Sequence, residues 1–377
     1  MSLPPTPGVS TPTPRLHWMD RLRQFWQRVS EGRQIDDLWS QFVADARSSY
    51  GFYDRDVDWE EIHKLSPWRR PLHVARQFFW ALLLKMSPAR RVLLLIAFVM
   101  LAMSLFNSET RFEVVAVMLF VLLLSLELAD KVTMKRDLEI AREIQTWLVP
   151  SQPPEVPGAN IAFATRPQNS VAGDYYDAFY PNPEDGEKLM VVIADVAGKS
   201  VPAALLMATL QASLRTIAGE NAPLADLVAR LNRYACAHSL NGLRFTTAVL
   251  SEYNPASRRL TYVNAGHNAP ILRRANGTLE TLEVGGLPLG IRLDHSYETA
   301  SLQLKPGDAL IFFTDGVVEA FNESGEEFGN ERWLTAIRNL PDWDSQQTLQ
   351  FLMKRVDEFV GATRQADDIT CLVFRSK

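Results

Sequence analysis

The chain has 377 residues, of which 47% are hydrophobic and 22% charged, and its formal net charge is −5. These values are typical of a folded protein with two domains, or with one large domain and appendages, and they argue against a nucleic-acid-binding protein. The two cysteines, Cys236 and Cys371, lie outside any C-x-x-C pair, so we expect buried thiols in a reducing compartment.

The N-terminal region lacks the basic and apolar parts of a signal peptide. Residues 1–16 contain five prolines and are expected to form a disordered tail. Apolar residues at helical spacing predict one or two short helices within 17–49. The segment LHVARQFFWALLLKM (72–86) predicts an amphipathic helix that lies on the inner leaflet of a membrane. We expect residues 17–91 as a whole to form a cytoplasmic helical and amphipathic region.

Two apolar segments, Val92–Phe106 and Val114–Leu126, predict a transmembrane hairpin over residues 92–129. Each is shorter than the roughly 20 residues that a membrane-spanning helix needs, but basic residues at its flanks can reach the interface. Basic residues are frequent on both sides of the hairpin, and Arg111 alone lies in the connecting turn, so both ends are expected in the cytoplasm. A soluble pair of buried helices is the alternative.

The next segment, residues 131–150, is expected to form a linker helix that ends at Pro150. It carries two apolar faces, one of which is available for a second chain and the other for the following domain. This pattern favours a homodimer through residues 131–149; a single helix packed on its own domain is the alternative. The first face has heptad spacing and comprises Met134, Leu138, Ala141, Gln145 and Leu148; the second comprises Ile140, Ile144 and Trp147.

From about Ile161, strand-like runs alternate with helical ones. Asn276-Gly277 predicts a hairpin turn, and residues 254–257 (NPAS) predict another. Apolar spacing predicts a helix over 200–219 with Ser200 as its N-cap, and further helices after Asn221 and within 331–359. Successive hairpins with paired helices favour an α+β domain over 151–377, in which helices cover two sheets.

The segment Ala194–Ser200, ADVAGKS, ends like a phosphate-binding P-loop. A P-loop requires a glycine five residues before the glycine of Gly-Lys-Ser, because its backbone amides must fold around phosphates. Here that position is Ile193, inside a strand-like run, so the sequence excludes a P-loop.

Acidic residues at strand ends suggest a different chemistry. Any one of them is usually a solvated turn residue, but carboxylates that converge repel one another unless cations neutralise them. No lysine or arginine cluster accompanies these motifs at fixed spacing, and all-oxygen ligands suit Mg²⁺ or Mn²⁺. We therefore predict a two-metal site that activates water and binds a phosphoryl group. The motifs are GDYYD (Asp174, Asp177), ADVAG (Asp195), FFTDG (Asp315) and ADDIT (Asp367, Asp368).

These motifs occur in the order seen in bacterial PPM-type serine/threonine phosphatases, and the chain resembles the branch that includes stage II sporulation protein E and regulators of stress sigma factors. NAGHNAP (264–270), GGLPLG (285–290) and residues 307–329 also match, and EIAREIQTWLVPSQPP resembles the helix and proline turn that lead into such domains. The resemblance covers about residues 138–374. It implies a four-layer αββα sandwich, here preceded by the linker helix and the transmembrane hairpin.

The resemblance also implies roles for particular residues. Two Mn²⁺ or Mg²⁺ ions are expected, with Asp195 bridging them and with Asp174 and Asp195 as the catalytic residues. Gly173 and Gly316 would permit close backbone approach, Asp177 and Asp368 would support the site, and Glu319 and Asn322 would hold the loop after Asp315. The implied metal ligands are Asp174, Asp195, the carbonyl of Val196, Asp315 and Asp367.

The sequence departs from the family pattern in one place. Eukaryotic relatives have a histidine soon after the bridging aspartate, as an acid for the leaving group, whereas this chain has Val-Ala-Gly-Lys. Lys199 is then either a phosphate contact or a solvated loop lysine. His267 is either a direct participant in catalysis or a hydrogen-bonded turn residue.

The resemblance predicts a metal-dependent phosphatase tethered to the bacterial inner membrane, with its catalytic domain in the cytoplasm. Its implied substrate is a phosphorylated anti-anti-sigma-factor-type protein, and no nucleic acid is expected as a partner. One alternative is a membrane-anchored docking module of the same fold without activity. Another is a two-metal nuclease or other phosphodiesterase, which the acidic soluble part and the absence of a basic groove signature disfavour.

Overall fold

The computed structural model describes residues 70–106, 110–184, 186–220, 222–239 and 244–377. The expected tail at 1–16 and the helices expected within 17–49 lie outside the described residues. The chain divides into two units, Met1–Ala129 and Asp130–Lys377. Each unit is described by itself.

The first unit contains three apolar helical segments. α4 spans Arg70–Lys85, α5 spans Pro88–Phe106, and α6 spans Thr110–Leu148, so the expected linker helix is the C-terminal part of the same helix. Phe98 makes edge-to-face contacts with Phe79 and Phe120.

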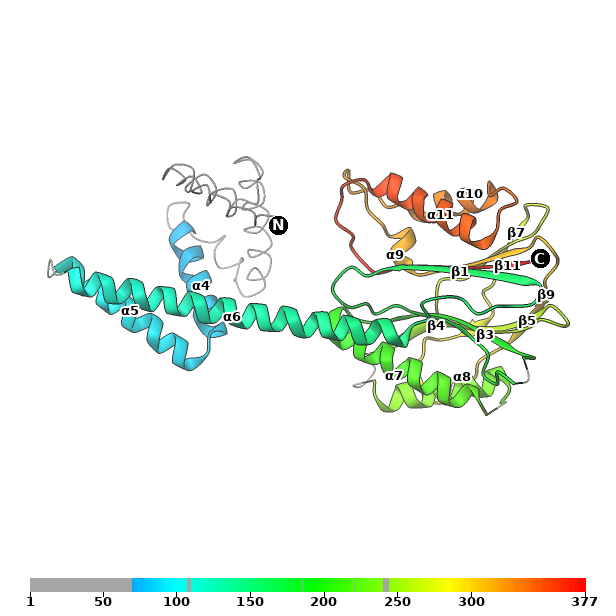
Figure 1. Cartoon of the computed structure of the whole chain (residues 1–377), viewed down its shortest axis with the longest axis horizontal. Coiled ribbons are helices and arrows are strands. Elements are labelled where there is room, and N and C mark those ends of the chain that lie inside the picture. The colour runs from blue at the N-terminus through cyan, green and yellow to red at the C-terminus, as the bar shows by residue number, and fades with distance from the viewer. Residues whose placement is uncertain (1–69, 107–109, 185, 221, 240–243) are drawn as a thin grey trace, which may run out of the picture. The chain divides into compact units, whose positions relative to one another are not determined.

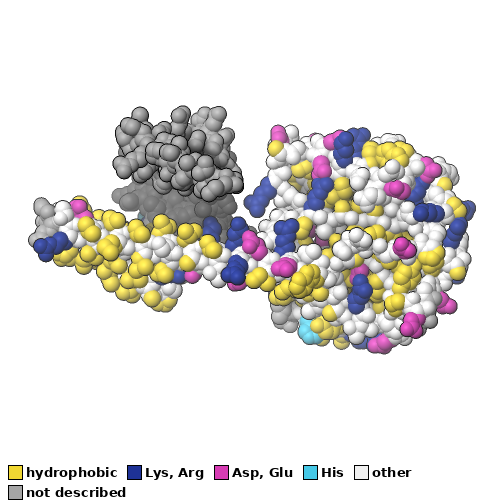
Figure 2. Space-filling view, viewed as in Figure 1, with side chains coloured by type: hydrophobic (Ala, Val, Ile, Leu, Met, Phe, Trp, Pro, Cys, Tyr) yellow, Lys and Arg dark blue, Asp and Glu magenta, His cyan; other side chains and the backbone are white. Residues whose placement is uncertain are grey.

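Many hydrophobic side chains of α5 and α6 are exposed, including Leu105 (81%), Met118 (66%) and Leu124 (69%), and Figure 2 shows them along this helical part of the chain. Helices that are hydrophobic on all sides require an apolar environment. In the described part of the chain, three helices are long and apolar enough to cross a membrane, at Pro88–Leu105, Thr110–Leu148 and Ser200–Ala218. The third packs Ala203, Met207 and Leu214 into the core of the second unit.

The second unit is a sandwich of two sheets with helices on both outer faces (Figure 1), which confirms the predicted αββα architecture. The strands of one sheet, in spatial order, are β1 (Ala159–Arg166), β11 (Ile369–Ser376), β10 (Ala309–Phe313), β6 (Ile271–Arg273) and β7 (Leu279–Thr281). Those of the other are β2 (Tyr175–Phe179), β3 (Leu189–Val196), β4 (Thr246–Asn254), β5 (Arg259–Ala265) and β8 (Gly285–Gly286), and β9 (Ala300–Gln303) also pairs with β5.

Helices form the outer layers. α10 (Gly329–Arg338) and α11 (Ser345–Val360) cover the first sheet, and α7 (Ser200–Ala218) and α8 (Leu224–Ala237) cover the second (Figure 1). A short helix, α9 (Asp315–Val318), follows β10 directly. The sequence did not predict α9, because a helix this short has no apolar periodicity to reveal it.

The strand β3 is a continuous apolar run up to Ala194 because both of its faces are buried. Its residues alternate between two cores: Leu189, Val191 and Ile193 face the other sheet, whereas Met190 and Val192 pack against α7 and α8. Because both faces of a central strand in a four-layer sandwich are covered, hydrophobic residues occupy successive positions. The run ends at Asp195, where the strand reaches the edge of the core.

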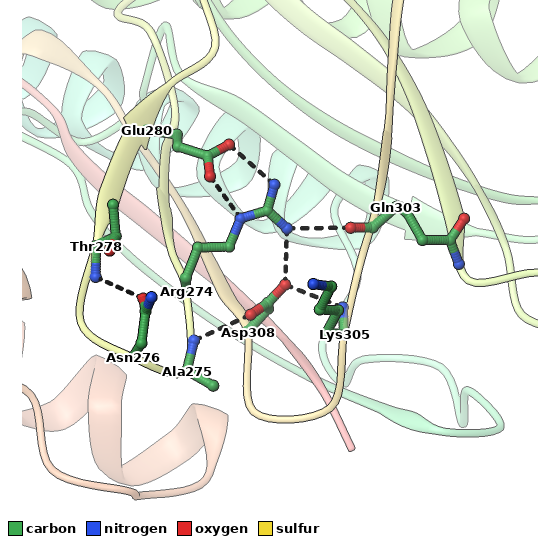
Figure 3. Close-up of polar contacts among 8 residues, drawn as sticks. All are labelled: Arg274, Ala275, Asn276, Thr278, Glu280, Gln303, Lys305 and Asp308. Carbon is green, nitrogen blue, oxygen red and sulfur yellow. Dashed lines mark hydrogen bonds and ion pairs between the residues drawn. The ribbon is translucent and has the colours of Figure 1, made fainter.

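The turn at Asn276-Gly277 joins β6 to β7, as predicted, with Gly277 in the left-handed region (φ +86°). A polar network fastens this hairpin to the turn before β10 (Figure 3). Arg274 bonds both Glu280 and Asp308, and the carboxylate of Asp308, which is almost fully buried, also accepts from the backbone amides of Ala275 and Lys305. This network positions the start of β10, which leads to Asp315.

Two local predictions were wrong. Ser200 is the first residue of α7 (φ +62°), and Lys199 occupies the N-cap position without a side-chain cap. The reason is the tight turn at Gly198, which brings the chain out of β3 and directly into the helix. Cys236 is half-buried and not fully buried, because α8 presents it near the helix end; Cys371, in β11, is buried as expected.

Candidate active site

Five carboxylates that are far apart in the sequence come together at one edge of the sandwich. Asp174 immediately precedes β2 and Asp195 lies near the end of β3, in one sheet. In the other sheet, Asp315 follows β10, and Asp367 and Asp368 precede β11. The hydroxyl of Thr314 donates to Asp174 Oδ2 at 2.9 Å, so a direct hydrogen bond joins the two sheets at this edge.

Mutual repulsion and burial raise the pKa values of these groups. Burial, followed by the charges of Asp315, Asp367 and Asp368, raises the pKa of Asp195 to about 7. Burial and the charge of Asp195 raise the pKa of Asp174 well above its usual range. Burial and the charge of Asp367 raise that of Asp315. The site therefore holds more negative charge than the surrounding chain neutralises.

Backbone amides hold Asp368 in place. The N–H groups of Gln168 and Gly173 donate to its two carboxylate oxygens, each at 2.6 Å. These bonds lower its pKa, but burial raises it by more. Asp368 therefore ties the loop before β2 to the loop before β11, and in doing so sets the position of Asp174.

Both glycines singled out in the sequence lie where backbone comes close. A Cβ on Gly173 would lie 3.2 Å from the carbonyl oxygen of Val196 and 3.6 Å from Asp195 Oδ1. A Cβ on Gly316 would lie 2.0 Å from the carbonyl oxygen of Asp368, which is a steric clash. The absence of side chains at these positions lets the carboxylate-bearing segments approach one another.

Asp177 lies in the same motif as Asp174 but is bonded elsewhere. It is fully buried, accepts two hydrogen bonds from Arg215 at 2.9 Å each, and accepts a third from the hydroxyl of Tyr175 at 2.6 Å. The guanidinium of Arg215 also lies 4.0 Å from the centre of the Phe179 ring. These partners fasten α7 to β2.

The side chain of Lys199 is bonded to the loop that carries Asp367. Its Nζ lies 3.0 Å from Asp367 Oδ2 and donates to the carbonyl of Ala366 at 2.9 Å. Although no lysine or arginine cluster accompanies the acidic motifs at fixed spacing in the sequence, the fold brings one cation to Asp367 and one to Asp177. Lys199 lies at the start of α7 and Arg215 lies within it. Each is distant in sequence from the aspartate that it pairs with, so motif spacing could not reveal these pairs.

His267 is buried next to β4, the strand that pairs with the Asp195-bearing strand β3. Its Nδ1 is 2.8 Å from the hydroxyl of Thr247, and Thr247 is the β4 residue paired with Asp195. The backbone amide and carbonyl of His267 bond the side chain of Asn264, which closes the turn after β5. Burial lowers the pKa of His267 to about 4, so the ring is neutral at physiological pH.

The donor set fits a hard divalent cation. All candidate ligands are oxygens, burial and mutual repulsion raise their pKa values, and Lys199 forms an ion pair with Asp367 alone. Among the described residues, no group of three or more His, Cys, Asp or Glu side chains converges closely enough to hold an ion as it stands. The fit therefore rests on the chemistry and charge of the carboxylates.

The supporting roles of Thr314, Thr370 and Gln145 were not predicted from the sequence. Thr314 bonds Asp174 and also accepts from the backbone amide of Thr370, so two threonines next to acidic motifs brace the site. Gln145 of α6 bonds the backbone of Ala172, just before Gly173. The available signals were the threonines adjoining TDG and DDIT, and a glutamine among apolar positions of a heptad.

The family model described as stage II sporulation protein E (SpoIIE) matches residues 185–377. Phosphoserine phosphatase RsbU of Bacillus subtilis is 30% identical over 192 residues, covering 51% of this chain and 56% of that protein. Protein IcfG of Synechocystis sp. is 28% identical over 283 residues, covering 67% of this chain and 44% of that protein. The chain thus spans about half the length of the curated relatives it matches.

Solved structures support the fold. The SiaA-PP2C domain of Pseudomonas aeruginosa superposes with a TM-score of 0.55 at 21% identity, covering 66% of this chain and 99% of that one. The PP2C phosphatase domain of SpoIIE from Bacillus subtilis, with a fragment of its regulatory domain, superposes with a TM-score of 0.52 at 20% identity, covering 59% and 64%.

Proposed function

The chain belongs to the stage II sporulation protein E (SpoIIE) family, and on that premise we propose that it is a metal-dependent protein serine/threonine phosphatase. One observation carries the proposal: acidic residues from both sheets gather at a single edge of the sandwich, where burial and their neighbours' charges raise their pKa values. They include Asp174, Asp195 and Asp315. A cluster of this kind requires cations, and phosphoryl transfer uses them.

In this proposal Asp174, Asp195, the carbonyl of Val196, Asp315 and Asp367 would hold two Mn²⁺ or Mg²⁺ ions, and Asp195 would serve both. Such ions, when bound, lower the pKa of coordinated water and neutralise phosphoryl oxygens. The chain's own task is to hold the carboxylates in register. Thr314 orients Asp174, and Asp368 fixes the loop that precedes it.

Lys199 and His267 have positioning roles in this scheme. The bond from Lys199 to Ala366 places its charge at Asp367. His267 supports Thr247 behind Asp195 and, being buried and neutral, is not placed as the proton donor of the leaving group. Neither residue replaces the histidine acid that the eukaryotic pattern carries.

The proposed substrate is a phosphoserine or phosphothreonine of an anti-anti-sigma-factor-type regulatory protein. Similarity to the phosphoserine phosphatase RsbU supports phosphoserine as the group that is hydrolysed. We would measure phosphate release from a phosphoserine protein and hydrolysis of bis(p-nitrophenyl) phosphate, each with and without Mn²⁺. Mn²⁺-dependent monoester hydrolysis is expected. Turnover of the diester alone would favour a phosphodiesterase, and no turnover of either would favour a docking module.

We further propose that α5 and the N-terminal part of α6 form a membrane hairpin, with both flanks in the cytoplasm of a bacterial cell. Their exposed apolar surfaces support this, as does the concentration of basic residues outside the connecting turn. A reporter fused after residue 108 should lie outside the cytoplasm. A cytoplasmic signal from that fusion would contradict the hairpin.

Homodimerisation through residues 131–149 is also proposed, and we assign it to the exposed apolar face that includes Ile144 and Trp147. Leu138, Ala141 and Gln145 are half-buried, whereas Ile144 (50%) and Trp147 (75%) are exposed. Trp147→Glu should shift the purified chain toward monomer in light scattering, and Arg142→Glu, on an exposed polar position of the same helix, should not. An unchanged mass for Trp147→Glu would exclude this face.

A further inference from the structure

A pocket of about 200 Å³ adjoins the candidate metal centre on the side of α11. Its wall is formed by Gly316 and the segment after α9, by the C-terminal end of α11, and by residues 361–367. Gly316, which follows Asp315, and Asp367, itself a proposed metal ligand, line the pocket. A group held here would therefore lie next to a phosphoryl group at the metal centre.

The wall of this pocket is fastened in place. The guanidinium of Arg166, at the end of β1, bonds both carboxylate oxygens of Asp357 in α11. The side-chain amide of Gln365 donates to the carbonyls of Arg166 and Asp367, each at 2.6 Å. These bonds join β1, α11 and the loop, so the pocket keeps its shape before anything binds, which lowers the entropic cost of binding.

Arg364 differs from the other arginine at this pocket. Arg166 is neutralised by Asp357, but Arg364 is exposed and has no hydrogen bond or ion pair with any residue that the structure describes. It lies three positions before Asp367, in the fastened loop. A guanidinium offers a planar pair of donors that matches the two oxygens of a carboxylate.

Phe321, Val356 and Val360 give the wall an apolar part, and its carboxylates, those of Asp357 and Asp367, are paired with Arg166 and Lys199. An apolar part of the wall and the exposed guanidinium of Arg364 suit a side chain that has a hydrocarbon stem and a terminal carboxylate. The volume is below the roughly 300 Å³ at which sites for whole small molecules begin, so it suits a single side chain.

We propose that this pocket is a specificity subsite that binds a glutamate or aspartate flanking the phosphorylated residue of the substrate protein, with Arg364 as the binding partner of its carboxylate. The inference rests on the proposed phosphatase function, because that function places the phosphorylated residue beside Asp367. Arg364 is a binding residue for the flanking segment and has no part in the hydrolysis of the phosphoester.

The test compares substrates that contain the phosphoryl group alone with substrates that also carry flanking residues. The full chain in detergent, with Mn²⁺, is assayed on p-nitrophenyl phosphate and on phosphoserine peptides in which one Glu is moved through the positions on either side, with Gln peptides as references. We expect at least one Glu peptide to be preferred. Arg364→Ala should lower kcat/KM for that peptide about tenfold, the loss expected for a charge-assisted hydrogen-bonded pair.

The same variant should leave p-nitrophenyl phosphate and the Gln peptides unchanged. Arg364→Glu should reverse the preference toward a peptide with Lys at the same position, which a purely structural role would not produce. Arg355→Ala is the matched control, because Arg355 is an arginine of α11 that pairs with Glu358 and does not line the pocket. Its kinetics should not change.

No Glu preference in the unmodified chain, or no loss in Arg364→Ala, would overturn the subsite. An equal loss on p-nitrophenyl phosphate and on all peptides would also overturn it, since Arg364 would then serve the phosphoryl group or the fold. Absence of Mn²⁺-dependent turnover of p-nitrophenyl phosphate by the unmodified chain would instead overturn the proposed function, and the subsite with it.

Discussion

The side-chain amide of Gln145 makes two hydrogen bonds with the backbone of Ala172: Nε2 donates to the carbonyl at 2.7 Å, and Oε1 accepts from the N–H at 2.9 Å. The next residue, Gly173, donates to Asp368 at 2.6 Å, and Asp174 follows. The C-terminal part of α6 is therefore bonded to the loop that carries a candidate metal ligand. A displacement of this helix would move Ala172, which lies two residues before the proposed metal ligand Asp174.

Replacing Gln145 with methionine keeps the length of the side chain and removes both bonds. Ala172 is 5% exposed, so its backbone groups would lose partners that water cannot easily replace. We expect the free energy of unfolding to fall by about 1–3 kcal/mol, and Mn²⁺-dependent turnover to fall as well. Urea unfolding and phosphate release would measure the two effects. A loss of stability with unchanged turnover would mean that the amide pair only packs the helix.

Asp177→Asn tests whether Asp177 has a structural role that differs from the proposed metal-binding role of Asp174, the other aspartate of the GDYYD motif. The substitution weakens the bonds to Arg215 and to the Tyr175 hydroxyl, so we expect a loss of about 1–3 kcal/mol in unfolding free energy. Mn²⁺ affinity, measured by calorimetry, should stay within about twofold, because this carboxylate is fully bonded away from the cluster. A large loss of Mn²⁺ affinity would place Asp177 among the ligands.

Gly316→Ala tests the close approach of α9 to the loop before β11. The new Cβ would lie 2.0 Å from the Asp368 carbonyl, a backbone atom that hydrogen bonds in this loop hold in place. We expect a loss of about 1–3 kcal/mol from overpacking, together with reduced Mn²⁺ binding. Gly219→Ala is the control, since its φ is −67° and its nearest neighbour would be 3.8 Å away. Equal stability of the two variants would contradict the described packing.

His267 should make stability depend on pH in the acidic range. Its pKa in the folded chain is about 4, below the usual value of 6.5, because burial disfavours the charged ring. Between these values the unfolded chain binds a proton and the folded chain does not, so stability falls as the pH falls. The contribution between pH 7 and pH 5 is about 2 kcal/mol.

His267→Asn should remove that part of the pH dependence, measured as the difference in urea unfolding between the variant and the unmodified chain. His238→Asn, at an exposed histidine, should keep it. If both variants behaved like the unmodified chain, His267 would not be buried in its neutral form.

The layers of the fold and the place of the carboxylates could be predicted from the sequence because each leaves a local pattern. Covered strands such as β3 are continuous apolar runs that stop at an acidic residue, and Asn276-Gly277 marks its hairpin turn. The order of the strands within each sheet leaves no such pattern, since β1 pairs with β11 across most of the second unit.

The parts that escaped prediction depend on contacts between distant segments. Lys199 pairs with Asp367, and Arg215 with Asp177, over separations that no motif spacing encodes. The sequence shows Gln145 only as one position of a heptad, and its bond to the backbone of Ala172 cannot be predicted from that pattern. The position of Ser200 at the start of α7 follows from the turn at Gly198, which the composition of the segment does not determine.

Carboxylates from both sheets are proposed to form one metal-dependent hydrolytic site, and Asp195→Asn tests this site most directly. Phosphate release from a phosphoserine protein would be measured with increasing Mn²⁺ for the unmodified chain, for Asp195→Asn, and for Asp226→Asn, an exposed aspartate in the first turn of α8. We predict Mn²⁺-dependent release in the first and third, and a loss of about a hundredfold or more in the second. Undiminished release by Asp195→Asn would contradict the claim.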